Sequence, residues 1–210
     1  MHYTDCLEKR EEVASFMRRL YTQKLTTCSG GNISVRLDEN HILITPSSLD
    51  KALIQADQIG IISLSGENLT PHLKPSIETG MHLQIYKVRP DVNAIVHAHP
   101  VHATSFTAMD AKIDITLTAE SFLVLKELAY PEYAMMGTKA LADFVADSLR
   151  DCNVCIMKNH GVTTVANSLL SAFDKIEVLE NAAIMTLNTF IAKSHSPLTK
   201  PQLDEILTTF

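Results

Sequence analysis

Residues 93–104 have the sequence NAIVHAHPVHAT. The apolar residues Ile95 and Val96 predict a buried strand over 93–99. Because side chains two positions apart in a strand point to the same face, His97 and His99 should converge at the end of this strand. Two imidazoles on one face can share a metal ion, although the same pattern also fits two histidines on a half-polar sheet face.

A third histidine that could complete a metal site is His160, in the segment KNHG (158–161). It follows the apolar run VCIM (154–157), which predicts a short buried strand. Three neutral imidazoles leave the fourth position of tetrahedral Zn²⁺ open, as in catalytic rather than structural sites. A metal ion held in this way keeps its full positive charge and can stabilise an oxyanion.

Glu78 is the candidate base for such a site. The sequence predicts a helix over 75–88, with Pro75 and Ser76 at its first positions and Pro90 ending it. Glu78 then lies in the first turn, shortly before the histidine strand. A carboxylate facing the metal there could move a proton on a carbon next to a carbonyl. A first-turn acid can equally well serve only to complement the helix dipole.

Three polar segments ahead of the histidine strand are candidates for binding an anion. The paired glycines of SGGN (29–32) can bring backbone N–H groups close to a ligand. The segment TPSS (45–48) offers three hydroxyls directly after a strand, and Ser76 stands at an expected helix start. A helix stop, a polar turn and a simple N-cap are the alternative explanations. Together the three segments could line a phosphate pocket beside the metal.

Composition and charge restrict the class of protein. The chain has 210 residues, 46% hydrophobic and 20% charged, which favours one domain over residues 1–210 and excludes a disordered chain. A net charge of −6 argues against nonspecific nucleic-acid binding. We expect no membrane attachment, because no apolar run approaches a spanning length. We expect a cytoplasmic location, because the charged N-terminus lacks a signal-peptide core and the four cysteines should be reduced.

Hydrophobic periodicity predicts the remaining elements. Helices are expected over 6–25, 138–150 and 168–193, with a short one after Pro201. The segments ISVRL (33–37) and HILIT (41–45) are typical of a hairpin, and IGIISLSG (59–66) of a further strand. Strands and helices are interspersed without strict alternation. This order predicts a layered α/β domain with a mixed or largely antiparallel sheet.

Taken together, these motifs resemble the class II sugar-phosphate aldolase family, which includes aldolases, a dehydratase, a 4-epimerase and the adducin head domain. The resemblance rests on SGGNISVR (29–36), ILITPSS (42–48), LKPSIETGMH (73–82), RPDVNAIVHAHPVHAT (89–104) and MKNHGV (157–162). It implies a three-layer α/β/α sandwich with a central, mainly antiparallel sheet. It also implies a four-fold homotetramer whose active sites are completed across subunit boundaries.

The resemblance also implies roles for individual residues. The zinc ligands, one ion per subunit, would be His97, His99 and His160, with Glu78 as the catalytic acid/base. The substrate phosphate would be held by Gly31, Asn32, Thr45, Ser47 and Ser76.

Three positions matter for comparison with the individual branches of this family. Ile77 replaces a serine that precedes the glutamate in the aldolase branch. Thr118 aligns near the position of a tyrosine that this branch contributes from a neighbouring subunit. Glu120 lies close to where the epimerase branch carries an acidic residue across the interface, which makes it a second candidate catalytic residue.

The predicted function is a zinc-dependent aldolase that acts on a short ketose 1-phosphate similar to L-fuculose 1-phosphate. It would release dihydroxyacetone phosphate and an aldehyde by way of a metal-bound enediolate. A sugar-phosphate dehydratase or a 4-epimerase using the same site stays open. A non-catalytic adducin-like module is less favoured, as is a metallo-hydrolase, because HAHPVH has Val101 where such runs need an aspartate. A nicotinamide dehydrogenase is disfavoured because no strand is followed by GxGxxG.

Overall fold

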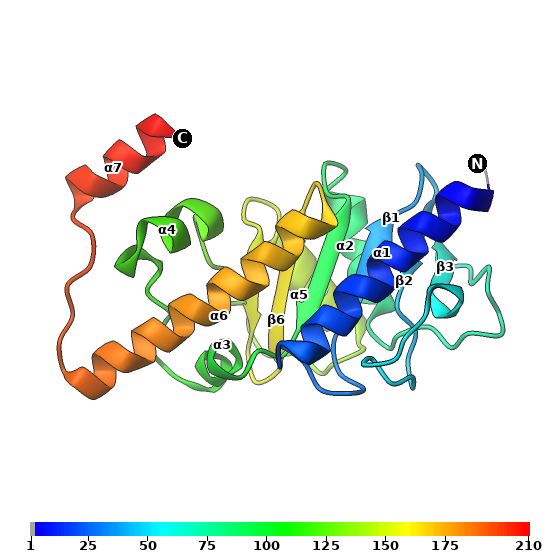
Figure 1. The fold of residues 1–210 in the computed structure, drawn as a ribbon, viewed down its shortest axis with the longest axis horizontal. Coiled ribbons are helices and arrows are strands. Elements are labelled where there is room, and N and C mark those ends of the chain that lie inside the picture. Colours follow the sequence, from blue (N-terminus) through cyan, green and yellow to red (C-terminus); the bar gives the residue numbers. More distant parts are fainter. Residues whose placement is uncertain (1–2) are drawn as a thin grey trace.

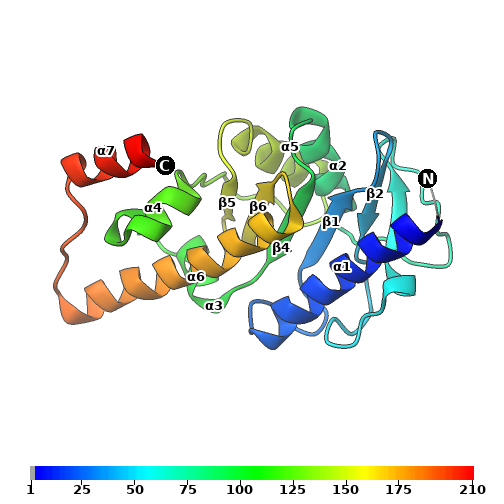
Figure 2. The same cartoon turned by 45° about the horizontal axis from the view of Figure 1, so that its top comes forward.

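A single sheet forms the centre of the computed structural model, which describes residues 3–210 (Figures 1 and 2). Its strands lie in the order β3-β2-β1-β4-β6-β5, and every neighbouring pair is antiparallel. The strands are β1 (Asn32–Arg36), β2 (His41–Ile44), β3 (Gly60–Ser63), β4 (Ala94–Ala98), β5 (Val154–Met157) and β6 (Gly161–Ala166).

Helices cover both faces of this sheet. One face packs against α1 (Tyr3–Thr22) and α6 (Leu169–Ala192), which cross it diagonally in Figure 1. The other face packs against α2 (Thr79–Val88) and α5 (Lys139–Ser148). The structure therefore confirms the predicted three-layer α/β/α sandwich with an antiparallel sheet.

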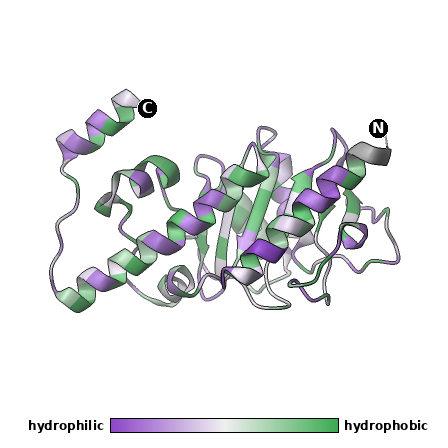
Figure 3. Ribbon diagram, in the orientation of Figure 1, coloured by the Kyte–Doolittle hydropathy of each residue, from purple (hydrophilic) through white to green (hydrophobic). Residues whose placement is uncertain are grey.

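Two separate apolar cores result from the alternation of side chains along the strands. In β4, Val96 belongs to the core beneath α1 and α6, whereas Ile95 belongs to the core beneath α2 and α5. In α1, Val13 and Met17 are fully buried and belong to the first of these cores. Figure 3 shows hydrophilic and hydrophobic residues alternating along α1 and α6, as expected of helices with one buried side.

The helix α2 begins later than the sequence predicts. It starts at Thr79, and Glu78 is its N-cap rather than a first-turn residue. Local hydrogen bonds explain the delay: the Ser76 carbonyl accepts from the backbone N–H and the hydroxyl of Thr79, and Ser76 Oγ accepts from the Glu78 N–H. Residues 76–79 therefore form a turn that leads into the helix, and Ser76 does not occupy the helix N-terminus.

Several elements were absent from the sequence prediction. The most important is β6, which follows β5 through a tight turn in which Asn159 has a φ of 53°. An asparagine in this conformation between two β-branched runs is a hairpin signal. The other missed elements are α3 (Val101–Ser105), α4 (Ala119–Leu125), and the 3₁₀ turns η1 (Ala56–Gln58), η2 (Phe106–Ala108) and η3 (Ile115–Leu117).

The C-terminal segment ends in α7 (Lys200–Thr209), which stands apart from the sheet in Figures 1 and 2. The predicted short helix is present, but Pro201 lies in its first turn rather than before it. The segment leading to α7 is held by a backbone hydrogen bond of 2.9 Å from Leu198 to Thr116 and by His195 against Asp114. None of the helices within residues 3–210 has the length and apolarity needed to span a bilayer.

Candidate active site

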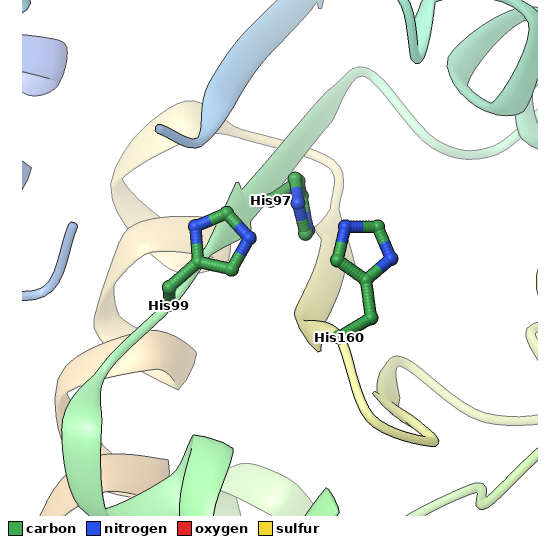
Figure 4. Close-up of side chains that lie close together, drawn as sticks. All are labelled: His97, His99 and His160. Atoms are coloured by element: carbon green, nitrogen blue, oxygen red, sulfur yellow. The ribbon is translucent and has the colours of Figure 1, made fainter. Parts of the chain in front are cut away.

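Three histidines meet at one end of the central strands. His97 lies in β4, His99 directly follows it, and His160 lies in the turn between β5 and β6. Because β6 pairs with β4 so that Val162 lies opposite Ala98, this turn is beside the end of the histidine strand. One ring nitrogen from each side chain lies within 4.8 Å of the others, and Figure 4 shows the three rings grouped together.

The ring of His97 is oriented by the backbone of β6. Its Nδ1 lies 2.9 Å from the Val162 carbonyl, which can only accept, so we assign the proton to Nδ1. The other nitrogen, Nε2, then carries a free lone pair. It is fully buried and has no hydrogen-bond partner within the described part of the chain. A histidine held by a carbonyl on one side and directed at a metal on the other is the usual arrangement of a metal ligand.

The protonation of these rings also fits a metal site. Burial lowers the pKa of His97, and burial together with the neighbouring imidazoles lowers the pKa of His99 to about 3. Both rings are therefore neutral near pH 7, which is the form that binds a cation. Three convergent imidazoles and an orphaned buried nitrogen fit a zinc-type ion with an open coordination position.

Glu78 lies directly against this cluster. Its Oε1 is 3.0 Å from Nε2 of His160, and its Oε2 is 3.2 Å from Nε2 of His97. The side chain is buried, and Nδ2 of Asn32 donates a 2.7 Å hydrogen bond to Oε2. Although burial acts to raise it, the pKa of Glu78 lies below its usual range, because the contacts with His160 and Asn32 favour the carboxylate. Glu78 is thus an ionised base beside the three histidines.

A buried chain of hydrogen bonds orients Asn32. Its Oδ1 accepts from Nε2 of His82 at 2.6 Å, Nδ1 of His82 accepts from the Ser34 hydroxyl at 2.6 Å, and Ser34 Oγ lies 3.0 Å from the Tyr86 hydroxyl. Burial lowers the pKa of His82 to about 3, so the ring is neutral, with one donor and one acceptor nitrogen. His82 therefore has a structural role, since it holds the side-chain amide of Asn32 in place.

Replacing His82 by leucine should therefore destabilise the protein through this chain. The carbonyl oxygen of Asn32 would lose its donor in a buried setting, which costs about 1–3 kcal/mol for each such group. Urea unfolding of His82→Leu should show this loss, whereas His72→Leu at an exposed position should change the free energy of unfolding by less than about 0.5 kcal/mol. Equal stability of the two variants would contradict the assigned network.

A cavity of about 440 Å³ opens beside Glu78, which is large enough for a small phosphorylated sugar. Most of the predicted site residues contribute to its wall: Gly31, Asn32, Ser47, Ser76, Glu78, His99 and His160. Further residues that the sequence analysis did not single out are Lys51 and Met136. The wall joins the three polar segments to the histidine cluster, as the sequence arrangement predicted.

Two glycines allow the backbone to approach the histidines closely. Gly31 has a φ of +65°, and a Cβ there would lie 2.8 Å from the His97 carbonyl oxygen. A Cβ on Gly161 would lie 2.6 Å from Cδ2 of His99. Contacts this short do not occur for real side chains, so both positions require glycine if the rings are to keep their places.

Three predicted site residues are not part of the cavity wall: His97 of the histidine cluster, Thr45 and Glu120. Thr45 is fully buried, and its hydroxyl accepts a 3.1 Å hydrogen bond from the backbone N–H of Ile33, so it ties the end of β2 to β1. Glu120 is exposed in the first turn of α4 and does not line the cavity of its own chain. The predicted roles of Thr45 in phosphate binding and of Glu120 in catalysis are not tested by this arrangement.

Comparison with known proteins agrees with the fold. The family described as "Class II Aldolase and Adducin N-terminal domain" matches residues 11–187. The chain belongs to this family.

Similar proteins with more specific names are aldolases. An L-fuculose phosphate aldolase of Methanococcus maripaludis is 40% identical over 164 residues, which are 78% of this chain and 88% of that protein. A 5-deoxy-D-ribulose 1-phosphate aldolase of Bacillus thuringiensis is 32% identical over 180 residues, 84% of this chain and 83% of that protein. A solved L-fuculose 1-phosphate aldolase superposes with a TM-score of 0.87 at 28% identity, covering 96% of this chain and 95% of that one. These relatives support a class II aldolase.

Proposed function

We propose that the protein is a zinc-dependent aldolase that cleaves a short ketose 1-phosphate between C3 and C4. The products would be dihydroxyacetone phosphate and an aldehyde. The observation that carries this proposal is the placement of Glu78, whose two carboxylate oxygens lie 3.0 and 3.2 Å from Nε2 of His160 and His97. A base in contact with a three-histidine cluster fits proton transfer at a carbon next to a carbonyl.

The chain would hold the cation through His97, His99 and His160. Bound there, zinc would supply Lewis-acid stabilisation of the oxyanion that develops as the carbon–carbon bond breaks. The Val162 carbonyl keeps the His97 ring in the required orientation, and Gly161 leaves room for His99. These contacts fix the ligands before any ion arrives, which lowers the cost of ordering the site.

Glu78 would move the proton at C3. As the aldehyde forms, the proton of the C4 hydroxyl would pass to the Glu78 carboxylate. The electron pair of the broken C3–C4 bond stays on C3, and the protonated Glu78 would deliver its proton there to complete dihydroxyacetone phosphate. In the direction of synthesis the Glu78 carboxylate would remove the same proton. Asn32 holds Oε2 through its 2.7 Å hydrogen bond, so the carboxylate has one defined position for both steps.

The phosphate would lie against the polar wall of the cavity. Gly31, Asn32, Ser47 and Ser76 line this wall and supply backbone N–H groups, hydroxyls and an amide. Thr45 would support this wall indirectly, because its hydrogen bond with Ile33 keeps the end of β2 in register with β1. Binding energy from the phosphate is remote from the reacting bond, so it orients the substrate without stabilising the ground state at C3 and C4.

The proposal includes a homotetramer with sites completed between subunits. Glu120 is exposed and does not line its own cavity, so it would reach a substrate only from a neighbouring subunit. Exposed apolar side chains at the end of α6 and on α7, such as Ile191 and Phe210, support burial against another chain. Light scattering should give four times the chain mass of 23.2 kDa.

The direct test is incubation of the purified protein with L-fuculose 1-phosphate and 5-deoxy-D-ribulose 1-phosphate. Release of dihydroxyacetone phosphate, detected with a coupled dehydrogenase, is expected, and a chelator should abolish it. Loss of water without dihydroxyacetone phosphate would favour a dehydratase, and a changed C4 configuration would favour an epimerase. Either outcome would replace the aldolase proposal, and no reaction with any ketose phosphate would favour a binding module.

A further inference from the structure

Lys51 is a buried lysine in the wall of the cavity. Its side chain is only 1% exposed, and it lines the same space as Ser47, Ser76 and Glu78. Both ends of the residue are fixed: its backbone N–H donates to the Cys28 carbonyl at 2.8 Å, and Nζ donates to the Pro46 carbonyl at 2.5 Å. The ammonium therefore has a defined position next to the TPSS segment.

Among the residues that the structure describes, no carboxylate pairs with the charge of Lys51. An ammonium has three N–H donors, and within the same residues only one of them is used, by the neutral Pro46 carbonyl. Burial lowers its pKa to about 8, and no carboxylate acts in the opposite direction. The ammonium form still predominates at pH 7. A buried cation in proteins is almost always paired, so an unpaired one next to a cavity indicates that its partner enters the cavity.

The surroundings of Lys51 fit an anion. The neighbouring wall is formed by Gly31, Ser47 and Ser48, which offer the backbone N–H groups of Gly31 and Ser48 and two hydroxyls, and which carry no charge. Glu78 is the one acidic residue in the cavity wall, and its carboxylate is held by Asn32 and lies against His97 and His160. The cavity is thus divided into a cationic, donor-rich part and a part that holds the base.

We propose that Lys51 pairs with the substrate phosphate and makes the site select phosphorylated over unphosphorylated ligands. The proposal rests on the proposed function for the identity of the substrate, but the binding of a phosphate dianion to Lys51 does not require turnover. Hydroxyls and N–H groups can donate hydrogen bonds to a phosphate, but they do not neutralise its negative charge. A lysine at this position supplies the positive charge that does. It also accounts for a cation kept unpaired in the free protein.

The test measures binding of inorganic phosphate by calorimetry and by thermal unfolding, at constant ionic strength. Lys51→Met removes the charge and keeps an apolar stem, and Lys51→Gln removes the charge but keeps a hydrogen-bond donor. Both should bind phosphate roughly 10- to 100-fold more weakly than the wild type, the loss expected for one charged hydrogen bond. Lys74→Met is the matched control, because Lys74 is exposed and precedes Ser76 by two residues.

Unfolding without phosphate separates a binding role from a structural one. An unpaired buried charge destabilises the folded state, so without phosphate Lys51→Met should have an unfolding temperature equal to or above that of the wild type. Added phosphate should raise the unfolding temperature of the wild type and of Lys74→Met, but not that of Lys51→Met. Wild-type phosphate affinity in both Lys51 variants would overturn the proposal, as would a wild-type protein that does not bind phosphate. If neither Lys51 variant folds, the wild type decides. Phosphate binding that weakens as the pH rises through about 8, where Lys51 loses its charge, supports the proposal, and binding that is constant over this range overturns it.

This experiment also distinguishes the two proposals from each other. Lys51-dependent phosphate binding without cleavage of any ketose phosphate would contradict only the aldolase. Cleavage with an unchanged KM in Lys51→Met would contradict only the assignment of Lys51.

Discussion

Replacing Glu78 by glutamine should leave zinc in place and lower kcat by about 10²- to 10⁴-fold, the usual contribution of a positioned acid/base. Glutamine has nearly the same shape, and its amide oxygen can still accept the hydrogen bond from Asn32. It cannot take up or release a proton at C3. The KM for the ketose phosphate should change little, because the phosphate-binding wall is untouched. Release of dihydroxyacetone phosphate gives kcat, and elemental analysis gives the zinc content.

Glu67→Gln is the matched control for this variant. The substitution Glu67→Gln makes the same chemical change at an exposed position after β3, so the kcat of this variant should equal that of the wild type. A Glu78→Gln protein with full zinc content and normal turnover would remove Glu78 from the mechanism. If the variant loses zinc as well, then Glu78 acts on the metal ligands rather than on the substrate, since its oxygens lie against His97 and His160.

The sequence predicted those parts of the site that depend on short-range geometry. Alternation along a strand is enough to bring His97 and His99 to one face, and the apolar run 154–157 places His160 at the end of the next predicted strand. That His160 joins the other two depends on the pairing of β4 with β6, and β6 was not predicted. The resemblance to known motifs supplied this long-range information, which periodicity in one sequence does not contain.

The parts that could not be predicted depend on burial and on local competition for hydrogen bonds. Lys51 lies in a polar segment, where a lysine is normally exposed, and only the folded chain shows that it is buried against Pro46. The start of α2 shifted because Ser76 forms a turn with Thr79, so Glu78 became the N-cap. Thr45 matches the motif in sequence, and its hydroxyl also accepts a hydrogen bond from the Ile33 N–H, a contact that the sequence does not indicate.

The second large effect is expected from loss of a histidine of the cluster. His160→Ala should bind zinc at least about 100-fold more weakly and lose nearly all turnover, because removing a direct ligand costs at least as much as removing the groups that orient one. His160 is the preferred histidine to substitute because it lies in a turn, where alanine should disturb the fold less than at His97, which is fully buried within β4. Chelation of the wild type should produce the same loss, and added zinc should reverse it only in the wild type.

Zinc should also stabilise the folded wild type, and this effect does not depend on turnover. An ion that binds only the folded state at 100 times its Kd adds about 2.7 kcal/mol to the free energy of unfolding. His160→Ala should lose most of this zinc-dependent gain, whereas His72→Ala, at an exposed position, should keep it. Equal stabilisation of both variants by zinc would mean that the ion binds elsewhere. The convergence of the three rings would then have no part in metal binding, and Glu78 would lack the cation that its proposed role requires.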